Sequence, residues 1–142
     1  MESGLTDALI AVLAVVAFPF VFAGAWSLAL FANATIGGWS RLARSYRVDG
    51  ERPGHAALVS GSFRHFVSYR GVLYVAGTPE GLHLSVLRLF RPAHPNLLVP
   101  WEQVLHTGEA PSLLQRRVSL HVDGIPIAIP AEAWEAAEAA RG

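Results

Sequence analysis

The feature that most constrains this chain is a run of 33 residues between Asp7 and Arg41 that contains no Asp, Glu, Lys or Arg. Most of these residues are Ala, Val, Leu, Phe and Ile. A helix that crosses a bilayer needs roughly 20 consecutive apolar residues, so the run is long enough to cross once with residues to spare. We therefore expect a transmembrane helix over about residues 9–31, within an N-terminal anchor of residues 1–40.

The charges on either side of the run predict its direction. The short leader is acidic and has no basic residue, whereas three arginines follow the run before any acidic residue appears: Arg41, Arg44 and Arg47. Positively charged flanks stay on the cytoplasmic side. We expect a bacterial inner-membrane protein with its N-terminus outside and its C-terminal part in the cytoplasm. Trp26 and Trp39 are placed to lie in the interfacial belt, and Pro19 is expected to kink the helix.

Two other interpretations of the apolar run remain open. The triplet AGA at residues 23–25 resembles the cleavage site of a signal peptide. Signal peptides have a positive leader and an apolar core of only about 7–15 residues, so the acidic leader and the longer run favour an anchor. The third interpretation is the buried core helix of a soluble protein.

Small residues in the run offer a surface to a second membrane helix, because they let two helices approach closely. The candidate packing positions are Ala14, Ala17 and Gly24. The partner would be another membrane protein or a second copy of this chain.

Composition limits what the rest of the chain does. Residues 41–142 suit one small domain, with a juxtamembrane segment and linker at 41–54 and the domain proper at 55–142. The chain has no Cys, which excludes disulfides, thiol chemistry and Cys-based zinc sites. Its 11 basic residues are all Arg; Glu2 and Asp7 lie outside residues 41–142, so that part has a formal net charge of +2. Such a balance is far from that of a nucleic-acid-binding domain.

From Ala56 onward the pattern changes to one of strands, and alternating apolar residues predict that these strands are antiparallel. We expect strands at 62–69, 72–76, 82–86 with a possible extension to 90, 97–99, 100–104, 117–122 and 125–129. Turns are expected at 77–81 and at Asp123-Gly124, and loops at 91–96 and 108–112. Residues 130–141 begin with Pro130 and end with Arg141, which is typical of a helix. The fold class is therefore α+β: a transmembrane helix, a mainly antiparallel β barrel or sandwich, and a C-terminal helix.

Three segments resemble the pleckstrin-homology-like (PH-like) superfold, including bacterial PH and GRAM-type domains. They are EGLHL at 80–84, LVPWEQV at 98–104, and the last strand pair with its helix. The chain also resembles small membrane-anchored bacterial proteins that have GWxxLAxxYR and HPxLLxPW segments, here at 38–47 and 94–101. The resemblance implies seven strands, of which the pattern gives five or six, so that 63–67 and 88–90 would supply the rest. It also implies binding of lipid headgroups, peptides or proteins.

Basic residues around the fourth expected strand form the most suggestive binding cluster. We expect an anion or an anionic lipid headgroup to be bound by Arg88, Arg91 and His94, joined by Arg116 and Arg117 from a neighbouring strand. Arginine recognises phosphate and carboxylate through paired hydrogen bonds. Trp101 and Trp134 are expected to be the largest side chains of the core.

The sequence offers no strong catalytic or metal-binding motif. Six histidines are scattered without HxH or HExxH spacing, so we expect no metal and no cofactor. His65, His83 and His121 alternate with apolar residues, so we expect them to face outward. A membrane-tethered hydrolase or metal protein that uses His83, Ser85 or His121 is the least favoured alternative.

We therefore expect a single-pass, non-enzymatic binding or adaptor protein whose cytoplasmic domain binds a protein partner or an anionic headgroup. The alternative is a small accessory subunit that joins a larger membrane complex through its transmembrane helix. We expect the bilayer as a partner and no nucleic acid.

Overall fold

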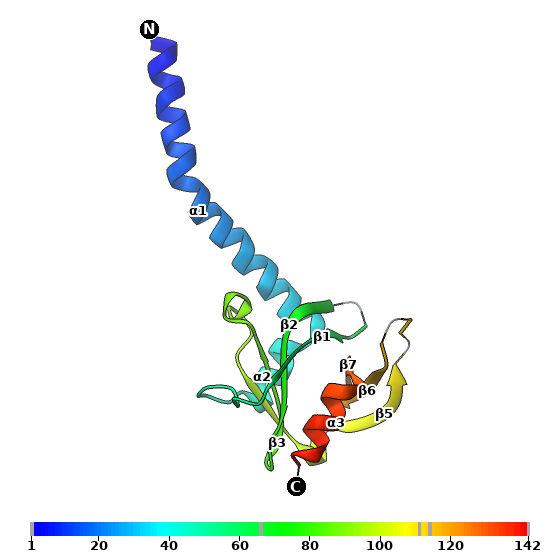
Figure 1. The fold of residues 1–142 in the computed structure, drawn as a ribbon. Helices are drawn as coiled ribbons and strands as arrows, with labels where there is room; N and C mark the ends of the chain where they lie inside the picture. The colour runs from blue at the N-terminus through cyan, green and yellow to red at the C-terminus, as the bar shows by residue number, and fades with distance from the viewer. Residues whose placement is uncertain (1, 66, 111, 114, 142) are drawn as a thin grey trace.

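A computed structural model describes residues 2–65, 67–110, 112–113 and 115–141 as one long N-terminal helix joined to an α+β domain (Figure 1). The helices are α1 (Glu2–Gly37), α2 (Trp39–Tyr46) and α3 (Ala131–Ala139), with two single 3-10 turns, η1 (Arg88–Phe90) and η2 (Trp101–Gln103). The strands are β1 (Ala57–Phe63), β2 (Val67–Gly77), β3 (Gly81–Val86), β4 (Leu97–Pro100), β5 (Leu105–Ala110), β6 (Arg117–Val122) and β7 (Ile125–Pro130).

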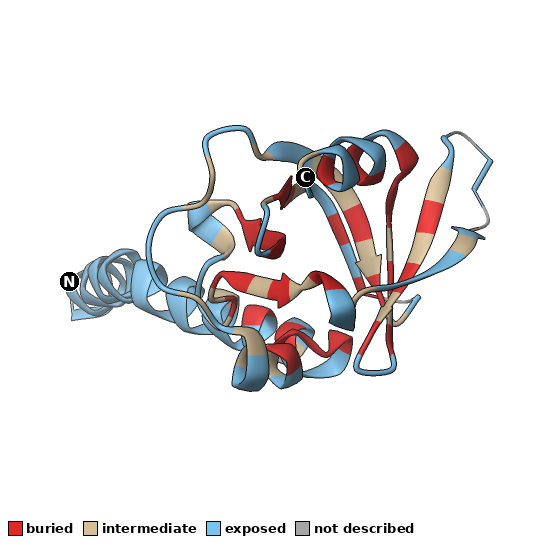
Figure 2. Ribbon diagram, turned by 90° about the horizontal axis from the view of Figure 1, so that it is seen from below, coloured by how far each residue is buried: buried red, intermediate tan, exposed pale blue. Residues whose placement is uncertain are grey.

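The seven strands form one antiparallel sheet in the order β4-β3-β2-β1-β7-β6-β5. The first strand, β1, joins the two halves, since it pairs with both β2 and β7. Its pairing with β7 is short and consists of Ser62 opposite Ala128 and Phe63 opposite Ile127. The sheet is curled into a half-barrel, and its buried residues gather on the inner side and beneath α3 (Figure 2).

Strand alternation explains which residues form the core. The inward positions of β6 and β7 are all apolar and buried: Val118, Leu120, Val122, Ile125, Ile127 and Ile129. Trp101 and Trp134 are also buried and lie with their rings 6.1 Å apart, which fixes α3 against the sheet. The helix approaches β2 so closely that a side chain on Gly77 would overlap the backbone of Ala137. Only glycine fits at that contact.

The long helix α1 is continuous through Pro19 and is apolar enough to cross a membrane. None of its most apolar 18-residue stretch is buried in the described structure. The interpretation of this run as a buried core helix is therefore wrong. The C-terminal third of α1 behaves differently, because Leu30, Ala34 and Gly37 are buried against the domain.

The corner between α1 and α2 packs into the hydrophobic core of the domain. Gly38 has a φ of 92°, which reverses the chain and directs Trp39 and Leu42 of α2 into the core. The Trp39 ring is fully buried, and its indole Nε1 donates a hydrogen bond to the carbonyl oxygen of Pro95 at 2.9 Å. Trp39 is thus a core residue, and its expected place in the membrane interface was wrong. Residues 39–46, at the start of the expected juxtamembrane segment, are thus helical.

The first hairpin is where the expected strands were wrong. A strand was predicted over 62–69, but β1 ends at Phe63 and β2 begins at Val67. Arg64 and His65, between them, have φ values of 52° and 68°, so two residues that usually avoid this region form the turn. Residues 69–72, between two of the expected strands, lie inside the single strand β2, in which Gly71 has a φ of 65°.

Two other expectations need correction. Residues 88–90 and 101–103 form 3-10 turns instead of strand. Leu87 and Pro100, which directly precede these turns, are in extended conformation. An edge strand, β5, runs through Gly108, where a loop was predicted over 108–112. Its side chains are mostly exposed, so it lacks the apolar alternation by which strands are recognised. The strands that bring the number to seven are therefore β1 at 57–63 and β5 at 105–110. Residues 88–90 contribute no strand.

Replacing Gly38 with Ala should destabilise the domain. An added Cβ would lie 2.6 Å from Cδ1 of Ile125, so we expect a loss of about 1–3 kcal/mol from overpacking, in addition to the cost of the positive φ. Gly50→Ala is the matched control, since Gly50 has a φ of 98° and nothing within 4 Å. The measurement is chemical unfolding of the full-length protein in detergent, followed by tryptophan fluorescence. Equal losses in the two variants would contradict the tight fit at the corner.

Candidate functional site

An open groove lies between two connections that are distant in the sequence. The α2–β1 connection (47–56) forms one wall, and the β3–β4 connection (87–96) forms the other. Two adjoining cavities of about 630 and 400 Å³ share Arg91 in their lining. Four guanidinium groups line them, and we name the site the arginine groove after these residues: Arg47, Arg52, Arg88 and Arg91.

Asn96 ties the two walls of the arginine groove together. Its side-chain oxygen accepts a hydrogen bond from Arg91 at 3.3 Å, and its amide nitrogen donates to the carbonyl of Gly50 at 3.1 Å. Its backbone carbonyl accepts from the N–H of Val48 at 2.9 Å. Asn96 is buried, so each of these bonds is shielded from water. These three bonds connect the two walls of the groove, although both walls are connections between strands or helices.

The guanidinium groups of the groove are available to a ligand. Arg52 lies 3.8 Å over the ring of Tyr74, a cation–π contact that holds it against the outer face of β2. Among the described residues, ion pairs within 4.0 Å are formed by Arg116 and by none of the groove arginines. Asp49 and Glu51 also line the groove, so its lining has a net positive charge.

His83 and Ser85 lie on the outer face of β3, beneath the α2–β1 connection. Both are buried, and among the described residues His83 Nδ1 and Ser85 Oγ have no hydrogen-bond partner. The expectation that His83 faces water was therefore wrong. Burial lowers the pKa of His83, and the positive charges of Arg52 and Arg91 lower it further. The same positive field favours an anion in the groove.

His94 borders the groove but is engaged by the protein. Its Nδ1 faces the carbonyl oxygen of Pro92 at 3.0 Å, so that nitrogen carries the proton and donates. Its Nε2 then accepts from the hydroxyl of Tyr69 at 2.9 Å. Burial lowers the pKa of His94 and raises that of Tyr69. His94 thus belongs to an aromatic cluster with Trp39 and Tyr69, and its nitrogens are occupied.

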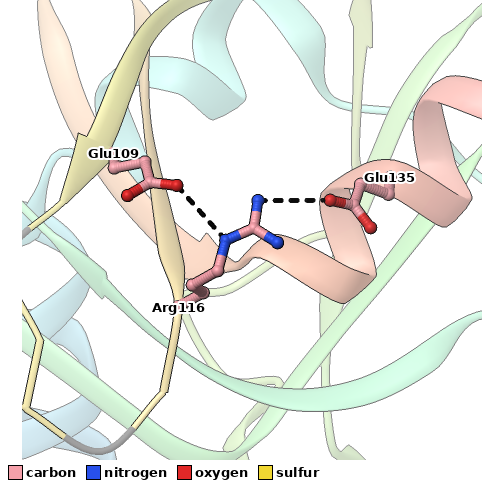
Figure 3. Close-up of polar contacts among 3 residues, drawn as sticks. All are labelled: Glu109, Arg116 and Glu135. Carbon is pink, nitrogen blue, oxygen red and sulfur yellow. Dashed lines mark hydrogen bonds and ion pairs between the residues drawn. The ribbon is translucent and has the colours of Figure 1, made fainter.

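Arg116 and Arg117 lie in another part of the sheet. Three strands, β2, β1 and β7, separate β6 from β3 in the sheet order. Arg116 makes ion pairs with Glu109 at 3.2 Å and with Glu135 at 3.3 Å (Figure 3). Arg117 lines a separate cavity of about 490 Å³ together with Arg70. The predicted cluster of five residues is therefore divided, and of its arginines only Arg88 and Arg91 lie in the arginine groove.

Arg47 and Arg52 are the groove residues that sequence reasoning missed. They lie in a segment that was interpreted as linker, and their neighbours in the groove are about 40 positions away in the chain. A guanidinium in a turn-rich segment next to a membrane anchor was the one available signal. The packing positions Ala14, Ala17 and Gly24 are all exposed along α1.

The residues of the alternative hydrolase or metal site do not form one site. His83 and Ser85 are on β3, whereas His121 is on β6, where its Nδ1 lies 3.3 Å from the hydroxyl of Thr107. Within the described ranges no three His, Cys, Asp or Glu side chains are grouped so that they could hold a metal ion.

The fold and the groove together define an α+β domain with a positively charged cleft, joined to a helix long enough to cross a membrane. No known protein family, no curated protein and no solved structure matches this chain.

Acid should destabilise the domain through its two buried imidazoles. His83 and His94 both have a pKa below the ordinary 6.5 in the folded state, so the unfolded chain binds more protons as the pH falls below that value. Stability is then complete above about pH 6.5 and decreases on acidification toward the folded pKa values. Unfolding measured between neutral and mildly acidic pH should show this loss. His83→Gln should reduce the slope, and His121→Gln is the control; a slope that His83→Gln leaves unchanged would contradict the assignment.

Proposed function

We propose that this chain is a single-pass inner-membrane protein that acts by binding and not by catalysis. Its β domain lies in the cytoplasm and holds an anionic phospholipid headgroup of the same membrane in the arginine groove. One observation carries the proposal: the indole Nε1 of Trp26, on α1, donates a hydrogen bond to the carbonyl oxygen of Leu89 at 3.1 Å. This bond joins the membrane helix to the connection that bears Arg88 and Arg91.

The length of α1 supports this location. A helix of 36 residues is about 54 Å long, whereas the hydrocarbon core of a bilayer is about 30 Å thick. Residues 8–27, about 30 Å of helix, fill that thickness, and residues 2–25 are all exposed. Trp26 is the first partly buried residue of α1 and then falls at the inner boundary, which is a preferred depth for tryptophan. The arginine groove therefore lies at the level of the headgroups.

The charge of the groove supports an anionic ligand. Each arginine near an anionic leaflet contributes about 1 kcal/mol of attraction, and a guanidinium binds a phosphate through two parallel hydrogen bonds. Arg41, Arg44 and Arg47 follow the membrane helix and favour the cytoplasmic side for the domain.

The element order supports a PH-like domain. Seven antiparallel strands, with β1 shared between two halves and a helix after the last strand, agree with the architecture that the sequence resemblance implies. Domains of that kind bind headgroups, peptides or proteins, so the fold is compatible with the proposal and the groove residues support it.

Neutralising a groove arginine should reduce the preference for anionic lipid. The full-length protein is reconstituted in nanodiscs that hold equal amounts of phosphatidylglycerol and phosphatidylcholine, and the lipids that stay bound are counted by native mass spectrometry. Arg52→Gln and Arg88→Gln should each lower the ratio of bound phosphatidylglycerol to phosphatidylcholine about fivefold, the equivalent of ~1 kcal/mol.

Arg116→Gln is the matched control, because it removes the same charge at a distance from the groove and should leave the ratio unchanged. A ratio that neither groove variant alters would refute headgroup binding. A protein that co-purifies in stoichiometric amount, and is lost in both groove variants, would instead assign the groove to a protein ligand.

A second candidate function is supported by the exposure of α1. Ala14, Ala17 and Gly24 have no protein neighbour that covers them, and an added Cβ at Gly24 meets nothing within 4 Å. If the chain is an accessory subunit, another membrane helix packs there. Gly24→Leu should then abolish co-purification of that subunit from mild detergent, while Val16→Leu should not. Unchanged assembly in Gly24→Leu would exclude this surface.

A further inference from the structure

We propose that η1 is a second membrane contact, in which Leu89 enters the bilayer beside α1 and fixes the orientation of the domain on the membrane. The inference rests on the proposed function for one point, namely that α1 crosses the bilayer. The partner of η1 is then the lipid of that bilayer.

An aromatic row leads from α1 to η1. Phe18 and Phe22 have their ring centres 6.0 Å apart, and Phe22 and Trp26 have theirs 6.2 Å apart, as expected for residues four positions apart on one helix face. Trp26 then lies 5.1 Å from the ring of Phe90. Because α1 and η1 share this row, lipid that covers the exposed face of α1 reaches η1 without an intervening polar surface.

The exposure of η1 agrees with contact to lipid. Leu89 is 68% exposed at the tip of the turn, and Phe90 is partly exposed beside it. Arg88 and Arg91 flank this pair in the sequence, so basic side chains that suit a headgroup region lie next to the exposed leucine. Transfer of an exposed leucine out of water is favourable, and α1 carries η1 to the depth at which this happens. Figure 1 shows the η1 coil close to α1, on the side of the domain from which the helix leaves.

Several backbone polar groups of η1 and of the residues after it are paired, which suits that depth. The N–H groups of Phe90, Arg91 and His94 donate to carbonyl oxygens three residues before each, at 2.8, 3.2 and 2.8 Å. The carbonyl of Leu89 accepts from Trp26. A turn with satisfied backbone groups enters the interfacial region at lower cost than an open loop.

Other exposed leucines provide controls. Leu105, at the start of β5, is 61% exposed, and Leu113, in the β5–β6 connection, is fully exposed. Both belong to the edge of the sheet opposite β3 and β4. Exposure of a leucine alone therefore does not place it at the membrane.

The chain has no cysteine, which allows single labels to be introduced. The variants L89C, V16C and L105C are made in the full-length protein, labelled with an environment-sensitive fluorophore and reconstituted in nanodiscs of phosphatidylglycerol and phosphatidylcholine. A quencher attached to the lipid chains reports depth. We expect quenching and a blue-shifted emission for the labels at residues 89 and 16, and an aqueous spectrum for the label at residue 105.

The outcomes separate the two proposals. If the label at residue 16 is in lipid and that at residue 89 is in water, the η1 contact is overturned and the anchor stands. If the label at residue 16 is also in water, the anchor itself fails, and the proposed function fails with it.

Adding Trp26→Phe to L89C tests how η1 is held. Phenylalanine keeps the aromatic row but cannot donate to Leu89, so the label should lose part of its quenching. Unchanged quenching would overturn the assigned role of the Trp26 hydrogen bond in holding η1 at the bilayer.

Discussion

The structure depends on the burial of one indole, that of Trp39, in the half-barrel. Its ring packs at 5.2 Å from Phe63, 5.7 Å from Tyr69 and 5.2 Å from His94, and its nitrogen donates to Pro95. These neighbours come from β1, β2 and the β3–β4 connection. A buried tryptophan of this kind contributes several kcal/mol to stability, roughly 3–5 by truncation. Helix α2, which closely follows α1, is thus part of the hydrophobic core, so that no linker separates α1 from the domain.

This attachment fixes the position of the arginine groove relative to α1. A flexible tether lets a domain search the volume around its anchor, whereas a helix that ends inside the core holds the domain at one height and one orientation. Between the apolar stretch of α1 and the core, the described chain turns at Gly38. Next to this turn, Arg64 donates a hydrogen bond to the carbonyl oxygen of Ile36 at 3.1 Å. Under the proposed membrane location, a groove held in this way meets ligands of the membrane surface far more often than ligands of the bulk cytoplasm.

The sequence predicted the features that arise from neighbours in the chain. The long apolar helix, the hairpin at Asp123-Gly124 and the C-terminal helix were all expected, because each has its cause within a few residues. The first hairpin was misplaced, since Arg64 and His65 adopt positive φ values that no local pattern announces. The groove was predicted only in part. Arg88 and Arg91 lie close in the sequence. The segment that carries Arg47 and Arg52 is brought to them by the hydrogen bonds of Asn96 to Val48 and Gly50, which are distant from Asn96 in the sequence.

The two uses of arginine in this chain show why the groove points to a ligand. Arg116 meets two glutamates on an exposed surface, an arrangement worth only about 0–1 kcal/mol for each pair. Arg52 and Arg91 instead lie where their positive charges lower the pKa of the buried His83. Arg91 donates to Asn96 and Arg52 lies over the ring of Tyr74, so uncharged groups hold both guanidiniums. With four arginines and two acidic residues, the lining keeps a net positive charge, and the proposed anion binding rests on that charge.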